Sequence, residues 1–197
     1  MSRKYEQRRR AERQDETRQR IVEATIALHQ EVGGVVTTVS AIAERAGVER
    51  ATVYRHFPDE RALLQACTGH YISQNPPPNP MGWAQIAAPE ERLRVALHDI
   101  YAYHRANEMM LGRAVIDLPQ MPTLREVMAP FFAYWEQVRG LLAAPWEVDH
   151  LHRPLVAAAI GHAVAFPTWQ SLTREQGLDD VQAVVMMVAW VRCVARS

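Results

Sequence analysis

Hydrophobic residues recur at the spacing of an α-helix through most of the chain. The first such run begins near residue 16 and consists of Ile21, Thr25, Leu28 and Val32. Gly33 and Gly34 follow this run and predict the end of the helix, because glycine adopts the left-handed backbone conformation that closes many helices. Residues 1–15 carry almost no hydrophobic anchors, so we expect a flexible basic arm or a frayed helical extension there.

Three more helices are predicted before the middle of the chain. Thr37 and Thr38 can cap a short helix that Gly47 ends, and a second short helix covers about residues 50–56. Asp59 can then cap a fourth helix, which carries a pair of leucines and further apolar residues at helical spacing.

Residues 75–80 contain four prolines, which lack a backbone donor and cannot lie inside a helix. This stretch is the candidate boundary between an N-terminal unit and the rest of the chain. Helical patterns resume beyond it over residues 89–104, 109–118, 123–142 (with a break at or near Pro130), 154–172 and 179–195. No segment with strand-like alternation competes with them, so the sequence predicts an all-α fold.

The composition is that of a globular protein. Apolar residues make up 48% of the 197 residues and charged residues 22%, which is enough for a packed core. The longest apolar runs are shorter than the ~18–20 residues that span a bilayer, and no signal peptide is visible. We therefore expect a soluble cytoplasmic protein without a membrane partner. Cys67 and Cys193 lie far apart without metal-type spacing, so we expect reduced thiols and no metal site.

The net charge of zero conceals an asymmetry between the two ends of the chain. Residues 1–57 hold eleven Lys and Arg against eight Asp and Glu, whereas the remainder holds eleven against fourteen. The excess is sharpest in the first twenty residues, with eight basic and four acidic side chains. Such a distribution favours an N-terminal end that binds phosphate, although a charge run is also common on an ordinary solvated face.

Residues 38–64 have the layout of a helix-turn-helix. Ile42, Ala43 and Ala46 give the first short helix an apolar face, and Gly47 permits a sharp reversal of the chain. Val53 and Phe57 recur on the second short helix, which they would anchor across the first. In this motif the second helix enters the major groove of DNA.

The outward positions of that second helix carry groups suited to DNA. They are Arg50, Ala51, Thr52, Tyr54, Arg55 and His56. Five of them can donate or accept hydrogen bonds, and the alanine can touch a thymine methyl group. An all-helical ligand carrier or enzyme with an incidental helix-turn-helix is the alternative, and the clustered polar set favours DNA binding.

The same segment resembles the DNA-binding domain of the tetracycline-repressor (TetR) family. The resemblance covers about residues 17–67 and rests on ordered motifs, which are Thr38, Ile42-Ala43, Ala46-Gly47-Val48, the block from Thr52 to Phe57, and Leu63-Leu64. It adds Thr38 to the candidate DNA-binding residues. Three positions depart from the family pattern: Glu60 replaces a common phosphate-binding lysine, and His29 and Gly34 replace common aromatic residues.

The resemblance implies a ligand-responsive transcriptional regulator, most often a repressor, with three parts. These are a flexible basic arm over 1–15, a helix-turn-helix DNA-binding domain over 16–60, and a helical ligand-binding and dimerisation domain over 61–197. In such a homodimer the last two helices form a four-helix bundle and place two recognition helices on a palindromic operator. The candidate dimer residues are Ala157, Ala158, Gly161, Val181, Val184, Val188 and Val191.

By the same resemblance, a small molecule binds the C-terminal domain and releases the protein from DNA. A local excess of aromatic and imidazole groups favours a mostly apolar effector near Tyr101, His104, Trp135 and His162. No nucleophile, phosphate-loop or metal-helix motif occurs, so we expect no catalytic residues, no cofactor and no enzyme activity.

Overall fold

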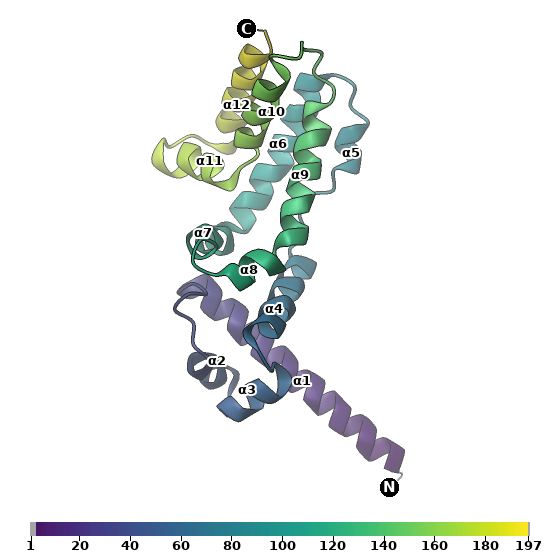
Figure 1. Ribbon diagram of the computed structural model, residues 1–197, viewed down its shortest axis with the longest axis vertical. Coiled ribbons are helices and arrows are strands. Elements are labelled where there is room, and N and C mark those ends of the chain that lie inside the picture. The colour runs from purple at the N-terminus through teal and green to yellow at the C-terminus, as the bar shows by residue number, and fades with distance from the viewer. Residues whose placement is uncertain (1–2, 197) are drawn as a thin grey trace. The chain divides into compact units, whose positions relative to one another are not determined.

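The computed structural model describes residues 3–196, and within them the chain forms helices and no strands (Figure 1). The all-α prediction is therefore confirmed. The helices are α1 Arg3–Glu31, α2 Val39–Ala46, α3 Arg50–His56, α4 Glu60–Gln74, α5 Met81–Ala84, α6 Pro89–Ala106, α7 Glu108–Asp117, α8 Pro122–Val127, α9 Ala129–Ala143, α10 Arg153–Ala163, α11 Phe166–Gln170 and α12 Asp180–Arg196, with a short π-helix η1 Ser171–Glu175 between the last two. None of the described helices is long and apolar enough to cross a membrane.

The chain divides into two compact units, each with its own core. The N-terminal unit contains the chain up to Pro76 together with Met109–Ala129, and the C-terminal unit contains Pro77–Glu108 and the chain from Pro130 onward. The expected end of the DNA-binding domain at residue 60 differs from this division. The reason is that Leu63, Leu64 and Cys67 of α4 are buried in the same core as α1, α2 and α3.

Helix α1 begins earlier than the hydrophobic pattern indicates. The structure continues the helix back to Arg3, which agrees with the helical extension among the two alternatives that the sequence leaves open; residues 1 and 2 lie outside the described part. Arginine, glutamate, glutamine and alanine dominate this stretch, and all four favour helix even without burial. An ion pair of 2.8 Å between Arg8 and Glu12, four residues apart, adds local support.

A buried carboxylate closes the turn between α1 and α2. Asp117, at the end of α7, is 6% exposed and accepts a hydrogen bond of 2.5 Å from the amide of Gly34. A Cβ atom at position 34 would lie 2.9 Å from Met121 Sδ, so the flexible side chain of Met121 would have to shift to admit a larger residue. The side chains of Asp117 and Met121 therefore lie where a side chain at position 34 would begin.

His29, the second departure, lies half-buried near the same turn. Its burial lowers the pKa of the imidazole, and the nearby carboxylate of Asp117 opposes that shift. Neutral histidine fills a position where the family pattern has an aromatic ring, so this departure also concerns packing.

The C-terminal unit is built around α6. Leu93, Leu97 and Ile100 are fully buried, and α12 packs against both α6 and α10. The predicted helix over 154–172 is wrong in its length, because α10 ends at Ala163 and a new helix begins at Phe166. Pro167 sits in the first turn of that new helix, where a missing donor costs nothing, whereas inside a longer helix it would break the hydrogen-bond ladder.

Candidate nucleic-acid interface

Local hydrogen bonds fix the start and end of α2. The Thr38 hydroxyl accepts a hydrogen bond of 3.2 Å from the amide of Ala41, which caps the helix. At the other end Gly47 has φ of +64°, a conformation that side chains disfavour, and the chain reverses there. Thr38 therefore has a structural role in addition to the DNA contact expected of it.

Helix α3 is anchored by two buried side chains. Val53 is 1% and Phe57 3% exposed, and both belong to the core formed with α1, α2 and α4. Asp59 accepts a hydrogen bond of 2.8 Å from the Ala62 amide and so caps α4 directly after α3. These contacts match the anchoring that the sequence predicts, and they hold the opposite face of α3 toward solvent.

That outer face carries the six expected groups. Arg50, Ala51, Tyr54 and Arg55 are exposed, whereas Thr52 and His56 are half-buried. The Arg55 guanidinium donates to the Thr52 hydroxyl at 3.2 Å, so two neighbouring side chains are oriented together. The arrangement presents hydrogen-bonding groups at the spacing of one helix face, which is what base edges in a major groove require.

His56 lies in a cationic environment at the end of α3. Burial is the main cause that lowers the pKa of its imidazole, and the guanidinium groups of Arg55 and Arg18 lower it further. Arg18 also lies 4.9 Å from the centre of the Phe57 ring, over its face. At neutral pH the imidazole is therefore uncharged and offers one donor and one acceptor.

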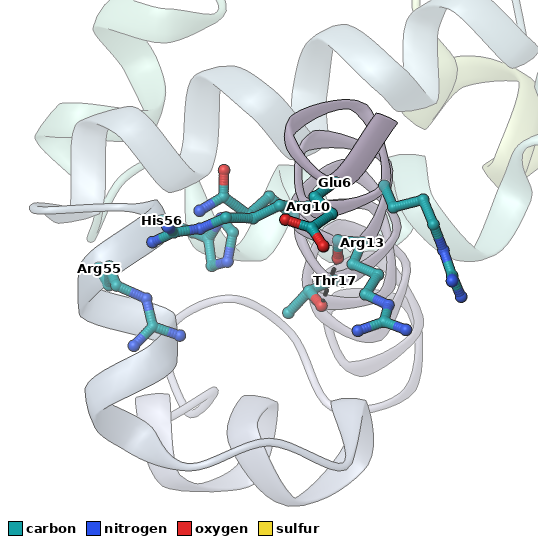
Figure 2. Close-up of a pocket in the computed structure, with 8 residues that line it drawn as sticks. Glu6, Arg10, Arg13, Thr17, Arg55 and His56 are labelled. Atoms are coloured by element: carbon teal, nitrogen blue, oxygen red, sulfur yellow. Dashed lines mark hydrogen bonds between the residues drawn. The ribbon is translucent and has the colours of Figure 1, made fainter. Parts of the chain in front are cut away.

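A cleft beside α3 contains basic residues that the sequence analysis did not select. It has a volume of about 620 Å³ and lies between α1 and the end of α3 (Figure 2). The residues that line it are Glu6, Arg9, Arg10, Arg13, Gln14, Thr17, Arg55 and His56. The six from α1 follow helical spacing, a signal that the sequence contains but that the lack of apolar anchors obscured. We call this the arginine cleft.

Glu60, the third departure from the family pattern, begins α4 and is exposed. A carboxylate in the first turn of a helix is stabilised by the helix dipole. It cannot make the phosphate contact of a lysine, so that contact of the family pattern is missing at position 60.

Residues 21–67 match the sequence profile of the bacterial regulatory proteins of the tetR family. The chain is also 31% identical over 141 residues to the HTH-type transcriptional repressor KstR of Mycolicibacterium smegmatis, an alignment that covers 72% of this chain and 60% of that protein. This chain belongs to the TetR family. The Mycobacterium tuberculosis KstR is 28% identical over 155 residues, covering 79% of this chain and 61% of that protein, so the chain spans about three fifths of these relatives' length.

Solved structures of TetR proteins share the fold. A TetR-like transcriptional regulator from Rhodococcus sp. RHA1 superposes with a TM-score of 0.64 at 16% identity, over 92% of this chain and 97% of that one. NalD, the secondary repressor of a multidrug efflux pump in Pseudomonas aeruginosa, gives 0.62 at 19% identity, over 93% and 97%.

The pocket residues that the TetR resemblance implies are only partly brought together. Tyr101 and His104 are buried in the C-terminal unit, and Trp135 lies with its ring 5.9 Å from that of His104. His162 is exposed on α10 instead, where its ring lies 5.3 Å from Trp190. The structure does not bring His162 to the rings around His104, and its place in the pocket stays a prediction.

His104 is the most unusual polar group in the C-terminal unit. Its Nε2 lies 3.1 Å from the carbonyl oxygen of Val164, while its buried Nδ1 has no hydrogen-bond partner. Burial lowers the pKa of this imidazole to about 4, so it is neutral. The rings around it belong to Tyr101, Tyr103, Trp135, Phe166 and Trp169.

The predicted dimer stripe on α12 is wrong for three of its valines. Val184, Val188 and Val191 are at most 4% exposed and pack inside their own protomer. Of the other candidates, Ala157 and Gly161 are half-buried on α10, and Ala158 and Val181 are exposed. The exposed apolar side chains lie on the other face of α12 and on α10: Val181, Val185, Met186, Trp190 and Leu155. We call this set the α10–α12 face.

Proposed function

We propose that this chain is a DNA-binding transcriptional repressor that acts as a homodimer and is released from a palindromic operator by a small molecule. The observation that carries the proposal is the outer face of α3. Its polar groups are exposed while Val53 and Phe57 are locked in the core, so a rigid helix presents them to a groove. The named relatives are HTH-type transcriptional repressors, which supports the same function. Such a protein acts in the cytoplasm, where it meets the chromosome.

Arg50, Tyr54 and Arg55 are the proposed major-groove contacts. Their side chains are exposed, and an arginine can bind both acceptors of a guanine edge. Thr52 and His56 lie nearer the rim of α3 and suit contacts to phosphate or sugar, which position the helix without reading sequence. Ala51 and Thr38 complete the proposed surface.

Substitutions on α3 test the function directly. Tyr54→Ala is expected to lower affinity for the operator about 10-fold or more, since one base contact contributes ~1–3 kcal/mol. Thr52→Ala is expected to lower it through the loss of a contact to phosphate or sugar. Operator fragments come from a footprint on DNA flanking the chain's own gene, and affinity is measured by gel shift at ~0.15 M salt. Gln65→Ala, an exposed change on α4, is the matched control and should bind as wild type. Wild-type affinity in both α3 variants would contradict the assignment.

The α10–α12 face supports the proposed homodimer. Val181, Val185 and Trp190 are 64%, 57% and 41% exposed, and clusters of large apolar side chains on a surface mark interfaces. The rings of His162 and Trp190 meet edge to face, which joins the exposed surfaces of the two helices. Two copies of this helix pair would form a four-helix bundle with the twofold symmetry of a palindromic operator.

The effector site is proposed around His104 in the C-terminal unit. Aromatic rings surround this imidazole, and its Nδ1 is a buried polar atom without a partner, which a ligand could satisfy. Charged side chains meet this ring cluster at Trp169, whose indole donates to Asp180 and whose ring lies under the guanidinium groups of Arg105 and Arg174. The other rings around His104 are aromatic and uncharged, so we propose a mostly apolar, drug-sized molecule.

A thermal-shift screen tests the effector. We expect apolar metabolites with one hydrogen-bonding group to raise the melting temperature and to weaken operator binding by a reciprocal factor. His104→Leu removes the unpaired nitrogen at similar volume, and it should reduce the shift while leaving operator binding intact. Stabilisation by anions alone, or equal shifts in wild type and His104→Leu, would place the effector elsewhere.

A further inference from the structure

We propose that the N-terminal half of α1 is a second DNA-binding element, in which Arg9, Arg10 and Arg13 hold the phosphate backbone beside the recognition helix. The proposal rests on the function proposed above and extends the interface beyond the helix-turn-helix. The binding site is the arginine cleft, and its occupant is the sugar-phosphate strand next to the groove that α3 enters.

The first argument is that the N-terminal half of α1 has no partner in the folded chain. Residues 5–16 are exposed at every position, and the first buried side chains of the helix are Ile21 and Val22. Twelve helical residues extend ~18 Å at 1.5 Å per residue. Figure 1 shows this part of α1 running beyond α3 without another helix beside it. A polar helix of this length gains nothing from core packing, so its side chains are available to an outside partner.

The second argument is the way in which the charges are arranged. The arginine cleft holds four guanidinium groups, those of Arg9, Arg10, Arg13 and Arg55, against the single carboxylate of Glu6. Among the described residues, none of these four arginines forms an ion pair with a carboxylate. Guanidinium groups bind phosphate oxygens in a bidentate fashion, and a phosphate strand would neutralise this concentration of positive charge.

The third argument identifies the occupant. Arg55 and His56 belong both to the outer face of α3 and to the wall of the cleft, so a molecule that contacts one surface reaches the other (Figure 2). A duplex bound by α3 presents a continuous phosphate strand at the edge of the groove. DNA contacts both the recognition helix and the adjacent arginines, because its phosphate strand borders the groove that α3 enters. An acidic peptide or an anionic membrane would not also contact the base-reading face of α3.

A salt-dependence experiment on the full chain tests this element. In the test variant Arg9, Arg10 and Arg13 are all changed to glutamine, which keeps the helix propensity and removes three charges. The control variant carries Arg8→Gln, Arg94→Gln and Arg139→Gln. These arginines are exposed, and each is paired with a carboxylate along its own helix. Both variants lose three arginines, so the change in net charge is the same. Arg8 lies on the same extension but does not line the cleft.

We expect the slope of log affinity against log salt to fall by ~0.9 for each lost phosphate contact, hence by ~2 to 3 in the test variant. Affinity for operator and for random duplex should drop by the same factor, so the ratio between them is preserved. Hydroxyl-radical footprints should lose protection at the flanking phosphates. The control variant should keep the wild-type slope.

An unchanged slope in the test variant, or an equal change in the control, would overturn the proposal while wild-type operator binding still stands. Absence of specific operator binding by the wild type would instead overturn the proposed function, so the two failures are distinguishable. Unchanged circular dichroism in both variants confirms that α1 stays helical, which the full exposure of these side chains leads us to expect.

Discussion

Changing Val185 and Trp190 together to glutamate is expected to convert the dimer into folded monomers that no longer bind the operator. Both side chains are well exposed in the protomer, so glutamate there leaves the core of the C-terminal unit intact. At a dimer interface the same carboxylates would be buried without partners, a change that costs several kcal/mol. Each recognition helix alone contacts only half of a palindromic site, so operator affinity should fall below detection.

Sedimentation velocity distinguishes monomer from dimer, and the melting temperature reports the protomer fold. Met81→Glu, another exposed apolar position in the C-terminal unit, is the matched control and should remain dimeric. Val184→Glu gives a contrasting result, because this side chain is buried inside the protomer and a charge there should unfold it. A Val185→Glu/Trp190→Glu protein that sediments as the wild-type dimer would place the interface on another surface.

The second large effect is expected at Asp117. Alanine at this position leaves the amide of Gly34 buried without an acceptor and removes a charge-assisted hydrogen bond. We expect the free energy of unfolding of the N-terminal unit to fall by ~2–3 kcal/mol. The amide of Gly34 should also lose its protection against hydrogen exchange, since the turn between α1 and α2 opens without its anchor.

Urea denaturation and amide exchange measure the two effects separately. Asp117→Asn keeps one acceptor oxygen of similar shape and should be less damaging than Asp117→Ala. Asp99→Ala, which removes the acceptor of the buried Trp83 indole in the other unit, should leave the exchange of Gly34 unchanged. Rapid exchange of Gly34 in the wild type itself would show that the carboxylate does not hold this turn.

The helix-turn-helix could be predicted from the sequence because its determinants are local. The reversal at Gly47 and the anchors Val53 and Phe57 lie within eleven residues of each other, and their spacing specifies the geometry. The hydrogen bond between Asp117 and Gly34 joins residues 83 positions apart, and no spacing rule connects them.

What the sequence left open on α12 and α1 has a different physical origin. Helix α12 is apolar on more than one side, so periodicity identifies a stripe without determining whether it faces the core or a partner. The packing of α6 and α10 decides this, and it turns Val184 inward and Val185 outward. The N-terminal extension of α1 is indicated by helix propensity and by the spacing of its charged residues, and hydrophobic anchors give no sign of it.

The discontinuity of the N-terminal unit limits how its operator preference can be inherited or engineered. Met121, Leu124 and Val127 pack against the core that α1 to α4 form, and Asp117 holds the turn before α2, yet all four are encoded more than thirty codons after Pro76. A recombination event with one crossover near the proline stretch would join a recipient's α7 and α8 to a donor's α1 to α4. Exchange of DNA specificity between relatives therefore needs either a double crossover or compensating changes at Gly34 and Met121. Point mutation on the outer face of α3 is the shorter evolutionary route to a new operator.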